Sequence, residues 1–178
     1  MIDNDISEVR SLLLANNSRS YTDSLVDMIG QKPELADLFW SLYLSLEGPV
    51  SRRAAWVISH TALRMPHLIR EEHLREMVMS APAMKHDGEK RNLAKVLTLV
   101  AIPAGIYGEV LDLCFKWLND SGESIAVRVY CMDILLTIST EIPEIRGELA
   151  STIENHMDRF STGLKNKGSK VLKRLSRL

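Results

Sequence analysis

The chain has 178 residues, 46% of them hydrophobic and 25% charged, and a formal net charge of −1. This composition is typical of a folded globular protein, so we expect a single domain over residues 1–178. The most apolar run, residues 96–107, is too short to cross a bilayer and is interrupted by Pro103 and Gly105. The sequence therefore predicts no membrane-spanning segment and no membrane partner.

The two cysteines and the first ten residues indicate the cellular compartment. Cys114 and Cys131 each lie in an apolar run, without a CxxC or Cys–His spacing. Buried reduced thiols are the expected state, and they fit a reducing compartment. The first ten residues are acidic and lack the apolar core of a signal peptide. We therefore expect a cytoplasmic protein.

Apolar residues at helical spacing predict helices along the whole chain. The expected helices span residues 5–15, 19–30, 33–46, 52–62, 67–80, 88–101, 106–118, 128–139, 142–160 and 168–178. Residues 81–88 are expected to form a loop, with Asp87 capping the helix that follows. The helix over 142–160 is expected to be the longest.

Four of these helices begin near an arginine and share one pattern. The arginines are Arg19, Arg52, Arg91 and Arg128, at intervals of 33, 39 and 37 residues. Mostly apolar residues stand two, three, six, nine and ten positions after each arginine, on one helix face. A proline follows each helix and favours its end: Pro33, Pro66, Pro103 and Pro143.

A two-helix unit repeated every thirty-odd residues resembles the HEAT-like and armadillo-like repeats, from Arg19 onwards. The resemblance implies an all-α, short right-handed α-solenoid of about four to five antiparallel helix pairs. Residues 1–18 would form an N-terminal capping helix and residues 163–178 a basic C-terminal helix. An irregular helical bundle with chance periodicity is the alternative.

No catalytic motif is present. The sequence lacks G-x-G-x-x-G, a P-loop and G-x-S-x-G. His67 and His73 flank Glu71 and Glu72, but this spacing points the two imidazoles apart on a helix, and we interpret the four residues as solvated charges. We therefore predict no catalytic residue, no metal and no cofactor.

The repeated arginines have two interpretations. A cation in the first turn of a helix opposes the helix dipole and needs a compensating contact. Nearby carboxylates (Glu47, Asp87, Glu89, Asp120 and Glu123) favour a ladder of ion pairs between repeats. The functional alternative is a basic ridge that meets an anionic partner. This ridge would comprise Arg52, Arg53, Lys90, Arg91, Lys95 and Arg128.

By the resemblance, these helices also line a concave surface, and Trp56, His60 and Arg64 would face it. Trp56, with Arg53 and His60 three and four residues away, is the candidate anchor for a partner, because tryptophan and arginine dominate interface energetics. Packing of Trp56 between repeats is the equal alternative.

These features favour a non-enzymatic scaffold that binds a protein or peptide on its concave face. The alternative is a nucleic-acid-binding or degenerate DNA-alkylation-repair-like protein using the basic ridge and the C-terminal tail. Residues 164–178 hold six basic and no acidic residues, which leaves −7 for the remainder and disfavours phosphate binding there. Apolar residues at helical spacing indicate that the tail docks as a last helix. An enzyme with a non-obvious site is the third hypothesis.

Overall fold

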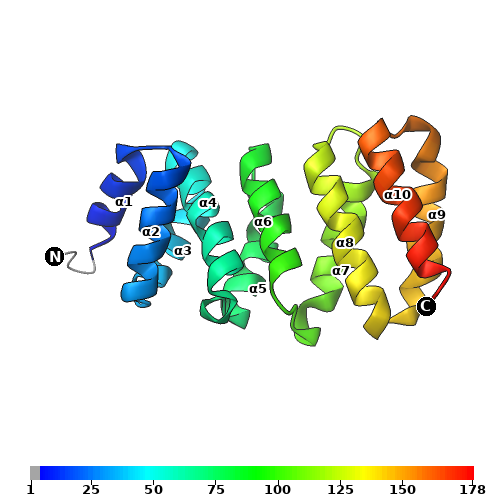
Figure 1. The fold of residues 1–178 in the computed structure, drawn as a ribbon, viewed down its shortest axis with the longest axis horizontal. Coiled ribbons are helices and arrows are strands. Elements are labelled where there is room, and N and C mark those ends of the chain that lie inside the picture. Colours follow the sequence, from blue (N-terminus) through cyan, green and yellow to red (C-terminus); the bar gives the residue numbers. More distant parts are fainter. Residues whose placement is uncertain (1–4) are drawn as a thin grey trace. The chain divides into compact units, whose positions relative to one another are not determined.

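The computed structural model describes residues 5–178, which form α-helices joined by short turns and contain no β-strand (Figure 1). The helices are α1 (Ile6–Ala15), α2 (Arg19–Gln31), α3 (Leu35–Leu44), α4 (Gly48–Arg64), α5 (Glu71–Ser80), α6 (Asp87–Leu99), α7 (Tyr107–Asn119), α8 (Ile125–Glu141), α9 (Arg146–His156) and α10 (Thr162–Leu175). The predicted all-α fold class is confirmed. Within this described part no helix is both long and apolar enough to cross a membrane.

The contacts group the chain into two compact units, Met1–Ile102 and Pro103–Leu178. The first unit contains helices α1 to α6 and the second contains α7 to α10. The single domain expected over residues 1–178 stays a prediction.

In the first unit, α4 is the central helix. It packs against α2, α3 and α6, while α3 also contacts α1 and α5. Helices α2, α4 and α6 thus form one layer and α1, α3 and α5 the other, as expected for stacked helix pairs (Figure 1). The core between them holds Phe39 and Tyr43 of α3, both fully buried. The nearly all-round apolar sequence of α3 is explained by this sandwiched position.

In the second unit, α8 packs against α7, α9 and α10, and α10 also packs against α9. Gly168 of α10 allows the close approach of α9. A Cβ atom at this position would lie 2.9 Å from Cγ2 of Ile153 and 3.2 Å from Cε of Met157. A small residue is therefore required where the two helices meet.

The repeat pattern corresponds to the observed helices. The four arginine-containing helices are α2, α4, α6 and α8, and each is the second helix of a pair. Helices α2, α4 and α8 end two residues before Pro33, Pro66 and Pro143, because proline disfavours a helical conformation in the residue before it.

Two boundary predictions were wrong. Residues 142–160 do not form the longest helix, because 3-10 turns at Pro143–Ile145 and Met157–Arg159 confine α9 to Arg146–His156. The longest helices are α4 and α8, with 17 residues each. Asp87 is the first residue of α6 and not its cap. Helix α10 begins at Thr162, one residue before the expected basic C-terminal helix over residues 163–178, and the Ser161 hydroxyl accepts a hydrogen bond from the Leu164 amide there.

Candidate functional site

Arg128 does not belong to an exposed ridge, which corrects the sequence interpretation. Its side chain is buried, its Nε donates a hydrogen bond to the Leu118 carbonyl at 3.1 Å, and its guanidinium carbon lies over the Phe160 ring. Burial lowers the Arg128 pKa, although Asp120 and Cys131 oppose the change. The residue binds the end of α7 and is part of the core of the second unit.

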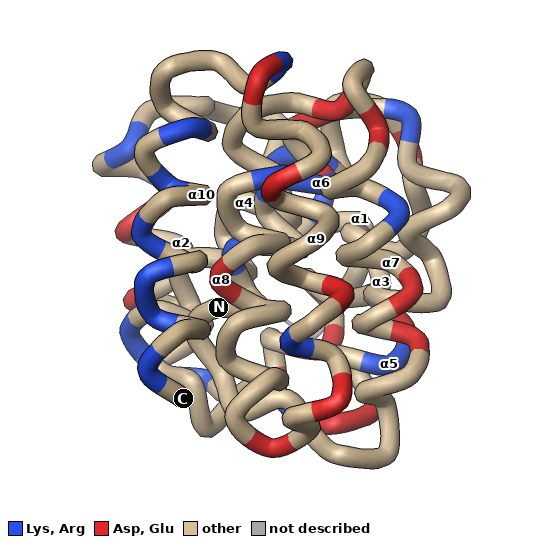
Figure 2. The backbone as a smooth tube through the Cα atoms, turned by 90° about the vertical axis from the view of Figure 1, so that its right-hand side faces the viewer, with Lys and Arg blue, Asp and Glu red and all other residues tan. Residues whose placement is uncertain are grey.

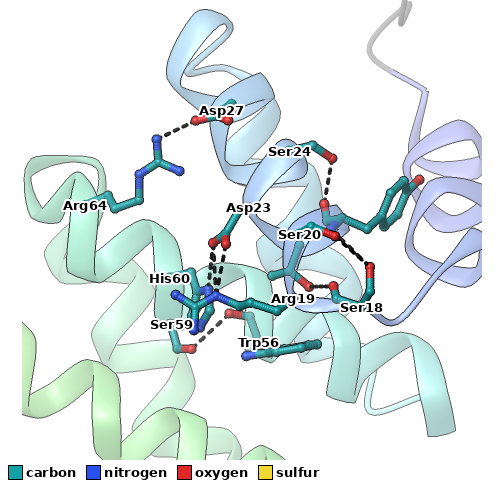
Figure 3. A network of polar contacts seen from close by, with 12 residues as sticks. Ser18, Arg19, Ser20, Asp23, Ser24, Asp27, Trp56, Ser59, His60 and Arg64 are labelled. Carbon is teal, nitrogen blue, oxygen red and sulfur yellow. Dashed lines mark hydrogen bonds and ion pairs between the residues drawn. The ribbon is translucent and has the colours of Figure 1, made fainter.

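Three other candidates are engaged by neighbouring helices of the first unit. Arg53 Nη1 donates to the Leu13 carbonyl of α1 at 2.7 Å, and Arg64 forms an ion pair with Asp27 of α2. His60 is buried, and its Nδ1 lies 3.4 Å from Oδ1 of Asp23 (Figure 3). These side chains hold α1 and α2 against α4.

The predicted ion-pair ladder has different members from those expected. Glu47 pairs with Arg10 of α1 and not with Arg52, while Glu89 is buried. Other contacts between successive helix pairs are Asp23 with His60, Asp27 with Arg64, Asp37 with Arg70 and His73, and Asp133 with Lys167. In these contacts the carboxylate comes from the earlier pair and the base from the next, whereas in the Arg10–Glu47 pair the order is reversed.

His73 is not a solvated charge. It is buried, and its ring stacks on Trp40 with centroids 4.5 Å apart. Its Nδ1 accepts a hydrogen bond from the Arg70 amide, and its Nε2 lies 3.2 Å from Oδ1 of Asp37. Burial, together with the charge of Arg70, lowers the His73 pKa. His67, by contrast, is exposed.

Three cations contributed by α2 and α6 lie near one another. Arg19 of α2 and Arg91 of α6 are exposed, and Lys95 of α6 is half-buried. Burial and the charges of Arg19 and Arg91 lower the Lys95 pKa, so Lys95 is close enough to both arginines to be repelled by them. Asp23, bonded to Arg19 Nε at 3.0 Å, compensates part of this charge.

The electrostatics of His60 and Asp23 follow from the same cluster. Burial lowers the His60 pKa first, and the charges of Lys95 and Arg19 lower it further, against the effect of Asp23. Burial by itself would raise the Asp23 pKa, but Arg19 and His60 hold it below its ordinary value. At neutral pH, His60 is therefore neutral and Asp23 ionised.

Trp56 is half-buried, so it is neither a fully buried core residue nor a fully exposed anchor. Its ring meets the His60 ring edge-on at 5.6 Å, which supports one side of the indole (Figure 3). Leu63, two turns further along α4 on the same stripe, is 53% exposed. We define the α2–α4–α6 face by five residues: Arg19, Trp56, Leu63, Arg91 and Lys95.

Arg52 and Lys90 complete the predicted set. Arg52 is exposed one turn before Trp56, and within residues 5–178 its side chain makes no hydrogen bond or ion pair. Lys90 is half-buried at the start of α6. The sequence reasoning used Arg19 only as a repeat marker and missed it as a site residue. Its i,i+4 spacing to Asp23 was the available signal.

The α2–α4–α6 face offers cations and apolar surface and can hold a carboxylate-bearing ligand. Comparison with known proteins adds the family. A family model of the HEAT repeat domain matches residues 9–175. Comparisons with curated proteins and with solved structures give no match.

Proposed function

The chain belongs to the HEAT repeat family, and from this premise we propose that it is a non-enzymatic scaffold that binds an acidic peptide segment of a partner protein on the α2–α4–α6 face. Stacked helical repeats commonly present an extended surface made by one helix of each pair. Two free, buried cysteines fit a reducing compartment, and we propose that the protein acts in the cytoplasm.

One observation carries the proposal: Lys95 lies within electrostatic range of Arg19 and Arg91, and Lys95 and Arg19 also act on His60, whose ring contacts Trp56, while Asp23 is the compensating carboxylate. Bringing cations together costs electrostatic free energy, which a bound carboxylate would offset. Guanidinium groups also bind carboxylates through paired, charge-assisted hydrogen bonds. An acidic ligand is therefore the complement of this face.

The apolar part of the face suggests an additional requirement. Trp56 and the exposed Leu63 would receive an apolar side chain next to the acidic residues of the ligand. A polyanion without apolar groups, such as nucleic acid, would leave them unused. Residues 1–102 also contain thirteen acidic and twelve basic residues, so this unit has no basic excess for a phosphate backbone.

The test is a binding titration with a labelled peptide in which glutamates alternate with leucines. A matched peptide carries glutamine in place of every glutamate. Trp40 and Trp117 are buried, so a change in tryptophan emission would report mainly on Trp56. We expect binding of the acidic peptide with altered emission, and affinity at least about tenfold lower for the glutamine peptide.

Two variants locate the binding. Lys95→Glu should weaken binding of the acidic peptide by about tenfold or more. Lys116→Glu makes an equal charge change at an exposed position of α7 and should have little effect on this binding. Trp56→Ala should weaken it without loss of helicity. Equal effects of the two lysine variants, or tighter binding of duplex DNA than of the acidic peptide, would overturn the proposal.

A further inference from the structure

A groove in the second unit is a separate candidate site. It encloses about 410 Å³ between α8 and the C-terminal end of α10 with the residues that follow it. Asp133, Leu136, Thr137 and Thr140 line it from α8, and Arg174, Arg177 and Leu178 line it from the other side. The Leu178 carbonyl accepts a hydrogen bond from Arg146 at 3.1 Å.

The charges in this groove do not cancel. Asp133 accepts a hydrogen bond from Lys167 of α10, so its charge is already compensated. Arg174 and Arg177 are exposed, and within residues 5–178 their side chains make no hydrogen bond or ion pair. Arg174 lies in the last turn of α10 and Arg177 in the turn that follows it, where the Arg177 amide donates to the Arg174 carbonyl at 3.0 Å. The groove thus has two guanidinium groups available to an anion.

The α8 wall adds one hydroxyl donor and an apolar surface. The Thr140 hydroxyl donates to the Thr137 carbonyl at 2.7 Å, whereas the Thr137 hydroxyl is exposed and has no partner among the described residues. Leu136 of this wall, only 5% exposed, and Leu178 of the other wall, 55% exposed, supply apolar surface. A ligand that carries both a carboxylate and an apolar group matches this lining.

The basic residues extend beyond the groove. Lys170 and Lys173 are exposed, α10 contains no acidic residue, and Figure 2 shows blue bands repeating along this helix. A small free carboxylate in the groove would not use these lysines. An extended acidic ligand can contact them and the two arginines together.

We propose that this groove and the adjoining surface of α10 bind an acidic peptide segment, with carboxylates on Arg174 and Arg177 and an apolar side chain on Leu136. This site does not depend on the α2–α4–α6 face, since its residues all belong to the second unit.

Charge distribution favours a peptide over nucleic acid. Residues 103–178 contain ten acidic and ten basic residues, and all ten acidic residues precede α10. A duplex that extends past α10 would meet these carboxylates, whereas a short peptide would not. Insertion of α10 into a lipid surface is disfavoured because its apolar residues Leu164 and Val171 are buried.

The test uses the full chain carrying Lys95→Glu, so that the face of the first unit contributes little. The probe is the labelled glutamate–leucine peptide, with the glutamine peptide as its control. Adding Arg174→Glu and Arg177→Glu should weaken binding at least about tenfold. Adding Lys116→Glu and Lys165→Glu instead makes the same charge change on exposed positions of the second unit outside the proposed site, and should weaken binding only about twofold to threefold.

The outcomes separate the alternatives. Equal loss in the two double variants would show diffuse attraction to the basic charges of the second unit and overturn the groove. Thr137→Val should also reduce affinity while leaving the melting temperature unchanged, and no change in affinity would count against the groove. Tighter binding of single-stranded DNA, or of vesicles of anionic lipid, than of the peptide would overturn the acidic-peptide assignment. The acidic-peptide assignment would also be overturned if the Lys95→Glu variant, with all groove residues unchanged, bound no peptide.

Discussion

The guanidinium carbon of Arg128 lies 4.9 Å from the centroid of the Phe160 ring. Arg128 belongs to the first turn of α8, and Phe160 lies in the turn between α9 and α10. The hydrogen bond from Arg128 to the Leu118 carbonyl adds the end of α7 to the same arrangement. One side chain therefore connects three segments of the second unit, which explains why an arginine is tolerated at the positive end of the α8 dipole.

Replacing Arg128 with alanine should lower the free energy of unfolding by about 2–3 kcal/mol, because a charged hydrogen bond and a cation–π contact are lost from a buried position. Arg91→Ala, at the equivalent repeat position but exposed, should change it by less than about 0.5 kcal/mol. Urea unfolding of both variants measures the difference. A similar change in both would show that Arg128 has no special structural role.

A second prediction concerns the contact between α9 and α10. Gly168→Ala should destabilise the protein by about 1–3 kcal/mol, because the new Cβ would overlap Ile153 and Met157 in a packed interface. Gly163→Ala, in the first turn of the same helix, meets no atom within 4 Å. It should be neutral or stabilise by up to about 1 kcal/mol through helix propensity. Stabilisation by both substitutions would mean that the two helices do not pack this closely in solution.

The sites of Arg128 and Gly168 show which features of the fold a helical repeat pattern can predict. The spacing of Arg19, Arg52, Arg91 and Arg128 predicted which helices repeat, because the apolar face of a helix is encoded in local sequence. It could not predict which arginine is buried. That depends on what each neighbouring segment offers: Arg128 meets Phe160 and a free carbonyl, whereas Arg91 meets solvent and other cations.

The candidate site was predictable only in part. Trp56 and Lys95 were identified from their places on the expected helices, but the role of Arg19 depends on the packing of α2 beside α4, with α6 on its other side. His73 was misinterpreted because its neighbours in sequence are charged, while its neighbours in space are Trp40 and Asp37. Contacts between helices more than thirty residues apart are not contained in a helical repeat pattern.

A third prediction follows from the buried histidines. The folded chain holds His60 and His73 with lowered pKa values. Burial is the main cause for both. At His60, the charges of Lys95 and Arg19 lower the pKa further, and Asp23 opposes them. At His73, the charge of Arg70 lowers the pKa further, and Asp37 and Glu72 oppose it. In the unfolded chain histidine takes up a proton near pH 6.5, so below about that pH the unfolded state binds more protons. The free energy of unfolding should therefore fall as the pH drops below about 6.5.

The measurement is the urea midpoint as a function of pH between about 7.5 and 5. In His73→Gln one of the three histidines with a lowered pKa (His60, His73 and His156) is absent, so the slope over this range should be smaller than in the unmodified protein. His67→Gln, which alters an exposed histidine, should keep the original slope. An identical slope in all three proteins would exclude His73 as a source of the pH dependence.

The last prediction concerns the thiols of α7 and α8. Cys114 and Cys131 are fully buried, and the Cys131 pKa is raised by a hydrogen bond with Cys114, by burial and by the nearby Cys114 and Glu123. Thiol reagents attack the thiolate and need access to the sulfur, so both conditions for reaction are unfavourable. In the native protein, modification by a disulfide reagent should be slow and should accelerate in urea in proportion to the unfolded fraction. Cys114→Ser should leave the native-state rate at Cys131 low, because burial remains. Rapid modification of the folded chain at neutral pH would show that α7 and α8 separate far more readily than their packing implies.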